Sequence, residues 1–397
     1  MTLHEIKAAF SIGALYVVRM LGLFMVLPVL PLAADSISGA TPFLIGLALG
    51  AYGLSQAVLQ IPMGIWSDKF GRRRIIIAGL AVFVLGSVIA GLSEDIYGII
   101  LGRFLQGCGA IASSLMALVS DVTQPNNRSK AMAIIGMSIG ASFGIALVVG
   151  PLINVHFGLS GIFLITALLG MLGILMATSF PGRSQQQKTE GWSLTGFKQV
   201  IGNGGLLRVT FGVFTLHYLL MSSFVVFPLL MAGTGQISPD VHHLYYLAIL
   251  VATFIVMSPL MRMSDKPGYA LPIALAMILA FVIANIVLAV DHHFYGVMIG
   301  MLLFFMAFNL LEVVLPAILS RIAPGEYRGS AMGVYSSAQF AGAFFGGALG
   351  GLIVSGWDIT YVLWVNALIC LVWLVISMSL RLDDSNVSSS AIRSSHD

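Results

Sequence analysis

Charged side chains lie deep within long apolar stretches of this chain at Arg19, Arg103 and Glu312. On membrane-insertion scales a charge that faces lipid costs about 2.5–3.5 kcal/mol, so we expect these groups to face water or one another. Glu312 is an isolated carboxylate in such a stretch, where it is well placed to take up and release a proton. The alternative role is that of a static counter-ion to a buried cation such as Arg19.

Neutral polar residues occur in apolar stretches of the same kind. Asn309 lies three residues before Glu312, so the two share one face of a helix. His217 can change its charge near neutral pH, although a histidine that is hydrogen-bonded to a neighbouring helix is the alternative. Structural ion pairs or backbone hydrogen bonds are likewise the alternative roles for Arg19 and Arg103.

No group of residues is spaced for enzymatic or metal chemistry. The chain has no phosphate-binding G-x-x-x-x-G-K-[ST] loop, no nucleophile–base set and no paired acids. The adjacent pair His242 and His243 lacks the spacing of metal ligands. Cys108 and Cys370 both fall in apolar stretches, which favours buried thiols over a disulfide. We therefore expect no enzyme, no metal and no cofactor, with the proton gradient as the source of energy.

The composition predicts an all-α membrane protein. The chain is 58% hydrophobic and 9% charged with a mean hydropathy of +0.98, whereas soluble domains have about 25% charged residues. A span needs about 20 apolar residues, and 397 residues accommodate many of them. We predict twelve transmembrane helices, at 10–34, 43–67, 75–93, 96–119, 131–154, 160–180, 207–231, 242–262, 270–290, 294–319, 329–354 and 358–380.

The connections between these spans alternate in charge. One set carries no basic residue and holds Asp35, Glu94, Asp95, Asp240, Asp291 and Asp358. The other set holds Lys69, Arg72, Arg73, Arg74, Arg128, Lys130, Arg183, Lys188, Lys198, Arg262, Lys266, Arg321 and Arg328. Because basic loops stay in the cytoplasm during insertion, we predict a multi-pass protein of the bacterial inner membrane with both termini cytoplasmic. This bias also accounts for the net charge of +3, so we expect no nucleic-acid partner.

The longest polar interruption divides the spans into six and six. We predict an N-terminal bundle at 1–180, a cytoplasmic linker at 181–206 and a C-terminal bundle at 207–380. The Ser-rich segment 381–397 is predicted to be a disordered cytoplasmic tail, with no soluble domain after it.

The two bundles carry signs of an internal repeat. When the chain is shifted by 200 residues, 128–153 falls on 328–353 without a gap, and Arg128 coincides with Arg328. Parallel repeats of six spans are a transporter architecture, with the binding site between the halves near the middle of the membrane.

The turn between the second and third spans contains Gly64, Asp68, Gly71, Arg72 and Arg73. This pattern resembles the G-x-x-x-D-x-x-G-R-[RK] signature of the major facilitator superfamily. The segment Arg103–Gly107 is similar to the second motif of that superfamily. A less regular version of its glycine–proline antiporter motif is formed by Gly136, Gly140, Gly144, Gly150 and Pro151. With twelve spans and the repeat, the resemblance covers nearly the whole chain and is of the drug:proton antiporter kind.

The resemblance implies roles for several of these residues. In that superfamily the first, fourth, seventh and tenth spans line a central cavity, which assigns Arg19, Arg103, His217, Asn309 and Glu312 to a site for substrate and proton. Asp68 would lie at the positive N-terminal end of the eleventh span. Arg72 would pair with Asp121, and this cytoplasmic latch would open and close with the halves. The alternative is a solvated basic turn that only sets topology.

Glycines of the fifth and eleventh spans are expected to form a dry seam between the halves. Small residues four apart let helices approach closely, and they occur at Gly136, Gly140 and Gly144 as well as at Gly342, Gly346, Gly347, Gly350 and Gly351. We expect this seam to act as a pivot.

Together these features predict a secondary transporter that works by alternating access. The expected reaction is the proton-coupled efflux of a small organic molecule by a monomer in the lipid bilayer. Many drug:proton antiporters carry an acid on the first span, whereas this chain has Arg19, which suits an anionic or zwitterionic substrate. The alternatives are a proton symporter or facilitator that imports a metabolite, and a membrane sensor that moves no substrate.

Overall fold

The described chain folds almost entirely into α-helices, as expected where backbone groups find no water to bond. The computed structural model describes residues 1–397 except 125–126, 181–193, 265, 267, 325–326 and 381–397. The first half comprises α1 (Leu3–Phe24), η1 (Ala34–Ser36), α2 (Pro42–Phe70), α3 (Arg72–Leu92), α4 (Ile96–Cys108), α5 (Ala112–Val122) and α6 (Arg128–Thr178). The second half comprises α8 (Gly204–Gly233), η3 (Pro239–Val241), α9 (His242–Ser264), α10 (Ala270–Val290), α11 (Phe294–Ile322), α12 (Arg328–Gly356) and α13 (Ile359–Met378), and α7 (Leu194–Gly202) precedes it.

Capping residues set many of the helix starts. Thr41, Asp95, Asn203 and Asp358 each accept a hydrogen bond from a backbone N–H in the first turn of the helix that follows. Gly71 separates α2 from α3 with a φ of +97°, a conformation that L side chains rarely adopt. The sequence therefore fixes these boundaries locally, before any tertiary packing.

In the described residues, eleven helices are long and apolar enough to cross a membrane, against twelve predicted spans. The difference lies in α6, a continuous run of 51 residues that contains both the fifth and the sixth predicted spans. Gly158 interrupts it with a φ of +67° and a ψ of −176°, so the helix bends sharply there. The connection that we predicted between the two spans is this single bend.

The two arms of α6 lie antiparallel along α1. In the first arm, Ser138 contacts Gly13 and Gly150 lies against the backbone of Met25. In the second arm, Thr166 lies against Gly22, so the chain has turned back along α1. Because α6 crosses twice, the fold has the twelve passes expected from the sequence, six in each half.

Two other predicted spans are less regular than expected. The regular part of α1 ends at Phe24, and residues 25–33 continue as tight turns. The fourth predicted span is divided into α4 and α5 by a break at 109–111. Gly109 lies against the backbone of Gly79 on α3 at this break, which brings α3 and α4 close together.

The predicted linker 181–206 is described only from α7 onwards. This short helix packs against α8 and α12, and α8 begins at Gly204, slightly before the predicted start at 207. Residues 181–193, with Arg183 and Lys188, lie outside the described residues, as does the predicted tail 381–397.

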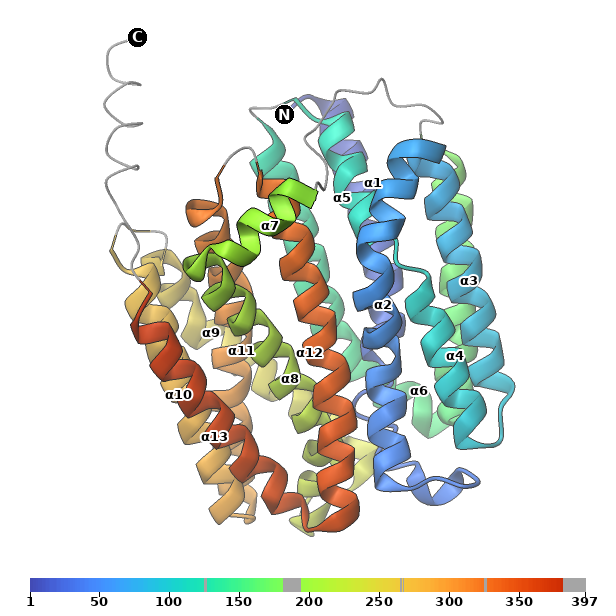
Figure 1. Ribbon diagram of the computed structural model, residues 1–397. Coiled ribbons are helices and arrows are strands. Elements are labelled where there is room, and N and C mark those ends of the chain that lie inside the picture. The colour runs from blue at the N-terminus through green and yellow to red at the C-terminus, as the bar shows by residue number, and fades with distance from the viewer. Residues whose placement is uncertain (125–126, 181–193, 265, 267, 325–326, 381–397) are drawn as a thin grey trace.

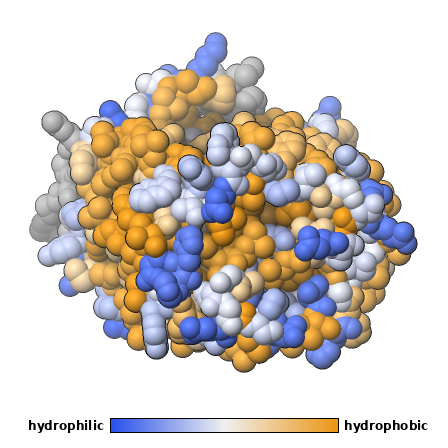
Figure 2. All heavy atoms as spheres, turned by 90° about the horizontal axis from the view of Figure 1, so that it is seen from below, coloured by the Kyte–Doolittle hydropathy of each residue, from blue (hydrophilic) through white to orange (hydrophobic). Residues whose placement is uncertain are grey.

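Connections of like charge gather at opposite ends of the molecule. The acidic end holds the connections with Asp35, Glu94, Asp95, Asp240, Asp291 and Asp358, and it lies at the bottom of Figure 1. Two of its loops are hydrogen-bonded, since Ser38 N donates to Glu94 O at 3.2 Å. The basic end holds the α2–α3 turn, α7 and the N-terminus, at the top of Figure 1. Figure 2 views the molecule from below, where hydrophilic residues are scattered over a largely apolar surface.

The two halves close on each other at the acidic end. Gly46 on α2 lies against the backbones of Gly347 and Gly351 on α12. Near this contact Phe43 N donates to Ser355 Oγ at 2.8 Å. Towards the basic end, α2 and α12 diverge (Figure 1). The structure is therefore closed at the acidic end.

The inner faces are open at the basic end. A Cβ atom added at Gly136 or Gly140 would have nothing within 4 Å. Phe10 near the start of α1 is 60% exposed, whereas Val26 and Leu30 beyond the end of that helix are fully buried. The structure is thus open at the basic end, on the side of the N-terminus, and closed at the acidic end.

Candidate functional site

Arg19 on α1 and Arg103 on α4 meet at the ring of Tyr52 on α2. Their guanidinium carbons lie 5.8 Å and 5.4 Å from the ring centroid, and both side chains are fully buried. A cation over an aromatic face is stabilised by about 2 kcal/mol or more where water is excluded. The first-half arginines therefore form one polar core, with Tyr52 between them.

The partners of both arginines are neutral. Arg19 Nη2 donates to Gln56 Oε1 at 2.6 Å, and Gln56 Nε2 donates to Gln60 Oε1 at 2.9 Å. Arg103 Nη1 donates to Gln106 Oε1 at 3.0 Å. Nε and Nη1 of Arg19 and Nη2 of Arg103 are buried without a hydrogen-bond partner among the described residues. Two positive charges are thus held inside the first half by dipoles and an aromatic ring.

A second polar cluster lies in the second half and joins three helices. Gln339 on α12 places its Nε2 at 2.8 Å from Nε2 of His217 on α8 and 3.4 Å from Oε1 of Glu312 on α11. Oε2 of Glu312 lies 3.7 Å from His217 Nε2. The Glu312 side chain is 32% exposed, so this acid borders open space. The cluster thus brings an acid and an imidazole together beside open space.

Asn309 and Tyr335 border this second cluster. Asn309 is three residues before Glu312 on α11, and its Nδ2 is buried without a partner within the described part of the chain. Tyr335 is buried on α12, one turn before Gln339. Asn309 therefore keeps a free donor beside the acid.

The five residues predicted to line one cavity belong to two clusters. Arg19 and Arg103 lie in the first half, and His217, Asn309 and Glu312 lie in the second. No hydrogen bond or ion pair among the described residues joins Glu312 to Arg19, the counter-ion considered from the sequence. What bridges the clusters is the pair Tyr52 and Phe340, whose rings are 6.4 Å apart across α2 and α12.

Tyr52 is a site residue that sequence reasoning missed. It precedes Gln56 and Gln60 by one and two helical turns, so the three share a face of α2. A polar stripe at four-residue spacing in an apolar span is the signal that points to this face.

Aromatic rings separate these clusters from the acidic end. Phe143 on α6 of the first half packs among Phe224, Phe305 and Phe308 of the second half, with centroids 5.6–6.3 Å apart. Phe308 lies 5.9 Å from the ring of His217. This aromatic group therefore packs between the two halves beside His217.

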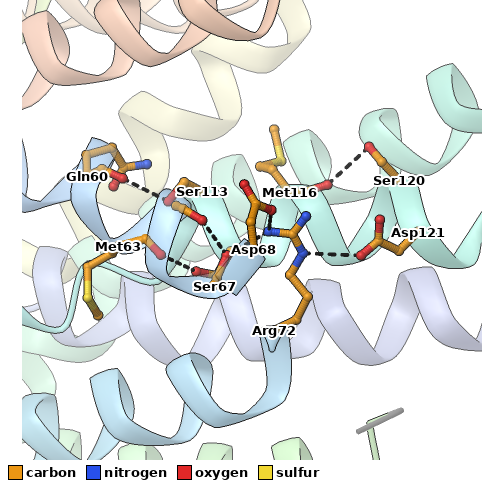
Figure 3. Close-up of polar contacts among 11 residues, drawn as sticks. Gln60, Met63, Ser67, Asp68, Arg72, Ser113, Met116, Ser120 and Asp121 are labelled. Atoms are coloured by element: carbon orange, nitrogen blue, oxygen red, sulfur yellow. Dashed lines mark hydrogen bonds and ion pairs between the residues drawn. The ribbon is translucent and has the colours of Figure 1, made fainter. Parts of the chain in front are cut away.

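The α2–α3 turn carries an ion-pair cluster that lies within the first half (Figure 3). Arg72 makes an ion pair with Asp68, and its Nε donates to Asp121 Oδ2 at 3.2 Å. Its Nη1 also donates to Ser67 Oγ at 2.7 Å. The pairing of Arg72 with Asp121 agrees with the prediction from the sequence. Asp68 is 51% exposed, so its carboxylate is accessible in this state.

The other motif residues of this turn, Gly64, Gly71 and Arg73, make no ion pair in the described part of the chain. Gly64 lies against Ser113 of α5, where a Cβ atom would come within 3.2 Å of the hydroxyl oxygen. Gly71 makes the turn, and Arg73 is partly buried in the first turn of α3.

The predicted glycine seam differs from the observed one. Gly136 and Gly140 line an open face of α6, and Gly144 only approaches Leu250 of α9. Gly150, followed by Pro151, packs on α1 inside the first half. The expected close packing at Gly136 and Gly140 is therefore absent in this state, because the halves diverge at the basic end.

The observed seam is formed by α2 and α12. On α2 it uses Gly46, Gly50 and Gly53, a spacing that the sequence analysis did not single out. On α12 it uses Gly347 and Gly351, while Gly342, Gly346 and Gly350 pack against α8 in the same half. Glycines on α12 thus serve two helix contacts.

Comparisons with known proteins agree on one family. The sequence pattern of the Major Facilitator Superfamily matches residues 12–229 and 209–394. The chain is 42% identical over 385 residues to the inner membrane transport protein YajR of Escherichia coli, across 96% of this chain and 85% of that protein. It is 29% identical over 350 residues to multidrug resistance protein 2 of Bacillus subtilis, across 85% and 86% of the two chains.

Solved structures share the fold at low identity. A bacterial homolog of the human lysosomal transporter Spinster, in an inward-facing and occupied conformation, aligns with a TM-score of 0.76 at 12% identity over 97% of this chain and 99% of that chain. The nucleoside transporter NupG aligns with a TM-score of 0.74 at 15% identity over 94% and 99%.

Proposed function

The chain belongs to the major facilitator superfamily of transporters, and from this premise we propose that it exports a small organic solute in exchange for protons by alternating access. The proposal is carried by the Glu312–His217–Gln339 cluster, which puts an acid and an imidazole together at the middle of the membrane spans. We place the basic end, with both termini, in the cytoplasm.

Alternating access is supported by the asymmetry of the contacts between halves. The seam of α2 and α12 is closed at the acidic end, while the glycine face of α6 is open at the basic end. Rocking one half against the other would exchange these two conditions, which is how transporters built from six-span repeats work. In this scheme the present state opens to the cytoplasm.

Efflux is supported by the names of similar proteins. Multidrug resistance proteins 1 and 2 of Bacillus subtilis are 24% and 29% identical to this chain. The buried charges Arg19 and Arg103 favour a solute that carries an acidic group over a purely cationic drug.

Proton coupling can be tested with purified protein in liposomes that contain the pH dye pyranine. Ethidium and a panel of radiolabelled carboxylates and amino acids would be offered from outside. In antiport, solute entry drives protons out and the lumen becomes alkaline, whatever the orientation of the protein. In symport the lumen becomes acidic, and this result would overturn the export assignment.

A matched pair of variants tests the residue assignment. Glu312→Gln is expected to abolish proton movement, because the amide cannot take up a proton. Glu94→Gln removes an exposed acid at the acidic end and should behave like the unmodified protein. Solute flux with unchanged proton movement in Glu312→Gln would exclude Glu312 as the proton carrier.

A further inference from the structure

Gln339 touches both titratable groups of the second-half cluster with one amide. Its Nε2 lies 2.8 Å from His217 Nε2 and 3.4 Å from Glu312 Oε1. A side-chain amide nitrogen carries two N–H donors, so it can donate to both groups at once. The amide is therefore shared between the imidazole and the acid.

The second nitrogen of His217 shows where its proton sits. His217 Nδ1 lies 3.2 Å from the carbonyl oxygen of Val213, which can only accept. The proton is therefore assigned to Nδ1, and Nε2 accepts from Gln339. This arrangement requires a neutral imidazole beside a carboxylate.

Proton uptake at His217 Nε2 or at Glu312 Oε1 is incompatible with the present orientation of Gln339. A proton added at His217 Nε2 would face the amide N–H, so two donors would oppose each other. A proton on the Glu312 oxygen that faces Gln339 would have the same effect. In either case the amide must turn and present its oxygen. The orientation of Gln339 therefore follows the protonation of these two atoms, whereas a proton on Oε2 of Glu312 would leave it unchanged.

The next residue of α12 contacts the other half of the molecule. The ring of Phe340 lies 6.4 Å from that of Tyr52 on α2. The carbonyl oxygen of Phe340 would lie 2.6 Å from a Cβ atom at Gly53. Neighbouring residues of one helix thus face the proton site and the seam between the halves.

We propose that Gln339 is a positioning residue that ties the protonation of Glu312 and His217 to the packing of α12 against α2. This inference rests on the proposed role of Glu312 as the proton carrier. When His217 Nε2 or Glu312 Oε1 takes up a proton, the amide of Gln339 turns. This turn alters the packing of the next residue, Phe340, against α2. The opening of the acidic end consequently depends on pH through Gln339.

Few titratable or charged groups lie around Gln339. They are His217 on α8, Glu312 on α11 and Tyr335 on α12, with Tyr52 on α2 across the seam and Arg19 and Arg103 behind its ring. The arginines contact only neutral partners among the described residues.

The test measures opening of the acidic end without any substrate. Spin labels would be attached to Tyr97→Cys on α4 and Tyr295→Cys on α11, which are 66% and 76% exposed. Cys108 and Cys370 would first be replaced by Ala. Double electron–electron resonance spectroscopy on the full chain in lipid nanodiscs would measure the distance distribution between the two labels. The pH would be varied from about 5 to about 9, the range in which histidine and a buried acid titrate.

The unmodified protein is expected to change its distance distribution with one midpoint. Gln339→Leu removes both hydrogen bonds, and Gln339→Asn is too short to reach both groups. In either variant the pH dependence should vanish, or its midpoint should move by about one pH unit or more. Ser337→Ala on the same helix is the control, since its hydroxyl has no partner among the described residues, and it should titrate normally.

The possible failures are distinguishable. If both Gln339 variants titrate like the unmodified protein while Glu312→Gln does not respond to pH, the role of Gln339 is wrong and the proton carrier stands. If Glu312→Gln also titrates normally, the proton-carrier assignment fails with it. A distance distribution that is independent of pH in the unmodified protein would overturn the inference directly.

Discussion

The backbone of Gly46 on α2 is in direct contact with that of Gly351 on α12. A Cβ atom at Gly46 would lie 2.7 Å from the Cα atom of Gly351, closer than side-chain carbons approach backbone atoms. Small residues allow such approach between membrane helices, where packing replaces the hydrophobic effect as the source of affinity. The closed acidic end therefore depends on the absence of side chains at this crossing.

Gly46→Val is accordingly expected to favour opening of the acidic end. Overpacking a close contact costs about 1–3 kcal/mol, and about 1.4 kcal/mol corresponds to a tenfold change in population. The spin-label pair at positions 97 and 295 should report a larger open fraction than in the unmodified protein.

Gly136→Val is a control variant that should shift the open fraction at the acidic end in the opposite direction. Position 136 has open space in the present state, so the substitution is harmless here. It would obstruct α6 only when the basic end closes, and the open fraction at the acidic end should fall. The same shift in both variants would show that general destabilisation, and not the seam, is being measured.

Tyr52 is expected to stabilise the first half through its ring and not through its hydroxyl. Its Oη is buried without a partner among the described residues, while its ring contacts both buried guanidinium groups. Tyr52→Phe should leave the free energy of unfolding unchanged, and Tyr52→Leu should lower it by about 2 kcal/mol. Unfolding in mixed micelles, followed by circular dichroism, measures both. Equal losses in the two variants would contradict the cation–π assignment.

Much of the fold follows from patterns that are local in sequence. Apolar runs predict the spans, and the alternation of charge assigns the loops to two ends of the molecule. Asp95 and Asp358 cap the helices that follow them. The merged helix α6 could not be foreseen, because a single glycine at 158 makes the reversal without a polar loop.

The site was only partly predictable for a different reason. Arg19, Arg103, His217 and Glu312 stand out because charge and polarity are rare in apolar spans. Which of them meet depends on how helices rotate and pack, and the sequence carries no direct record of that. The glycines of α12 were singled out from the sequence and those of α2 were not, because the partners of a glycine-lined face depend on the conformational state.

The latch should affect transport more than stability. Asp68 is half exposed and pairs with Arg72 in the same half, and an exposed ion pair contributes only about 0–1 kcal/mol. In the state that closes the basic end, we expect this carboxylate to reach the N-terminus of α12. Asp68→Asn should therefore leave membrane insertion and thermal stability nearly unchanged. It should also reduce solute flux in liposomes by about tenfold, the equivalent of about 1.4 kcal/mol.

Arg74→Gln is the matched control for the latch, because Arg74 is exposed in the same basic turn. Arg74→Gln should preserve solute flux if the position of Asp68 matters more than the total charge of the turn. The two variants change the charge of the turn in opposite directions, so equal loss in both would indicate that flux does not depend specifically on Asp68.

Stability towards acid should depend on Asp358 at the start of α13. Its Oδ1 accepts hydrogen bonds from the hydroxyl of Thr360 at 2.6 Å and from Thr360 N at 2.9 Å, and these bonds lower the pKa of Asp358 below its usual value. A carboxyl group whose pKa is lowered on folding contributes stability above its unfolded pKa of about 3.9, and this contribution is lost as the pH falls through the folded pKa.

The melting temperature in detergent should therefore fall as the pH is lowered from about 6 towards about 3, the range that spans the unfolded pKa. Asp358→Asn keeps a capping oxygen but cannot titrate, so it should flatten this dependence without abolishing it. A residual slope is expected because a hydrogen bond from His293 N also lowers the pKa of Asp291. Asp358→Ala loses the cap at every pH, and its melting temperature should already be low at pH 7. If the Asn variant lost stability in acid as steeply as the unmodified protein, the cap would not be the source of the dependence.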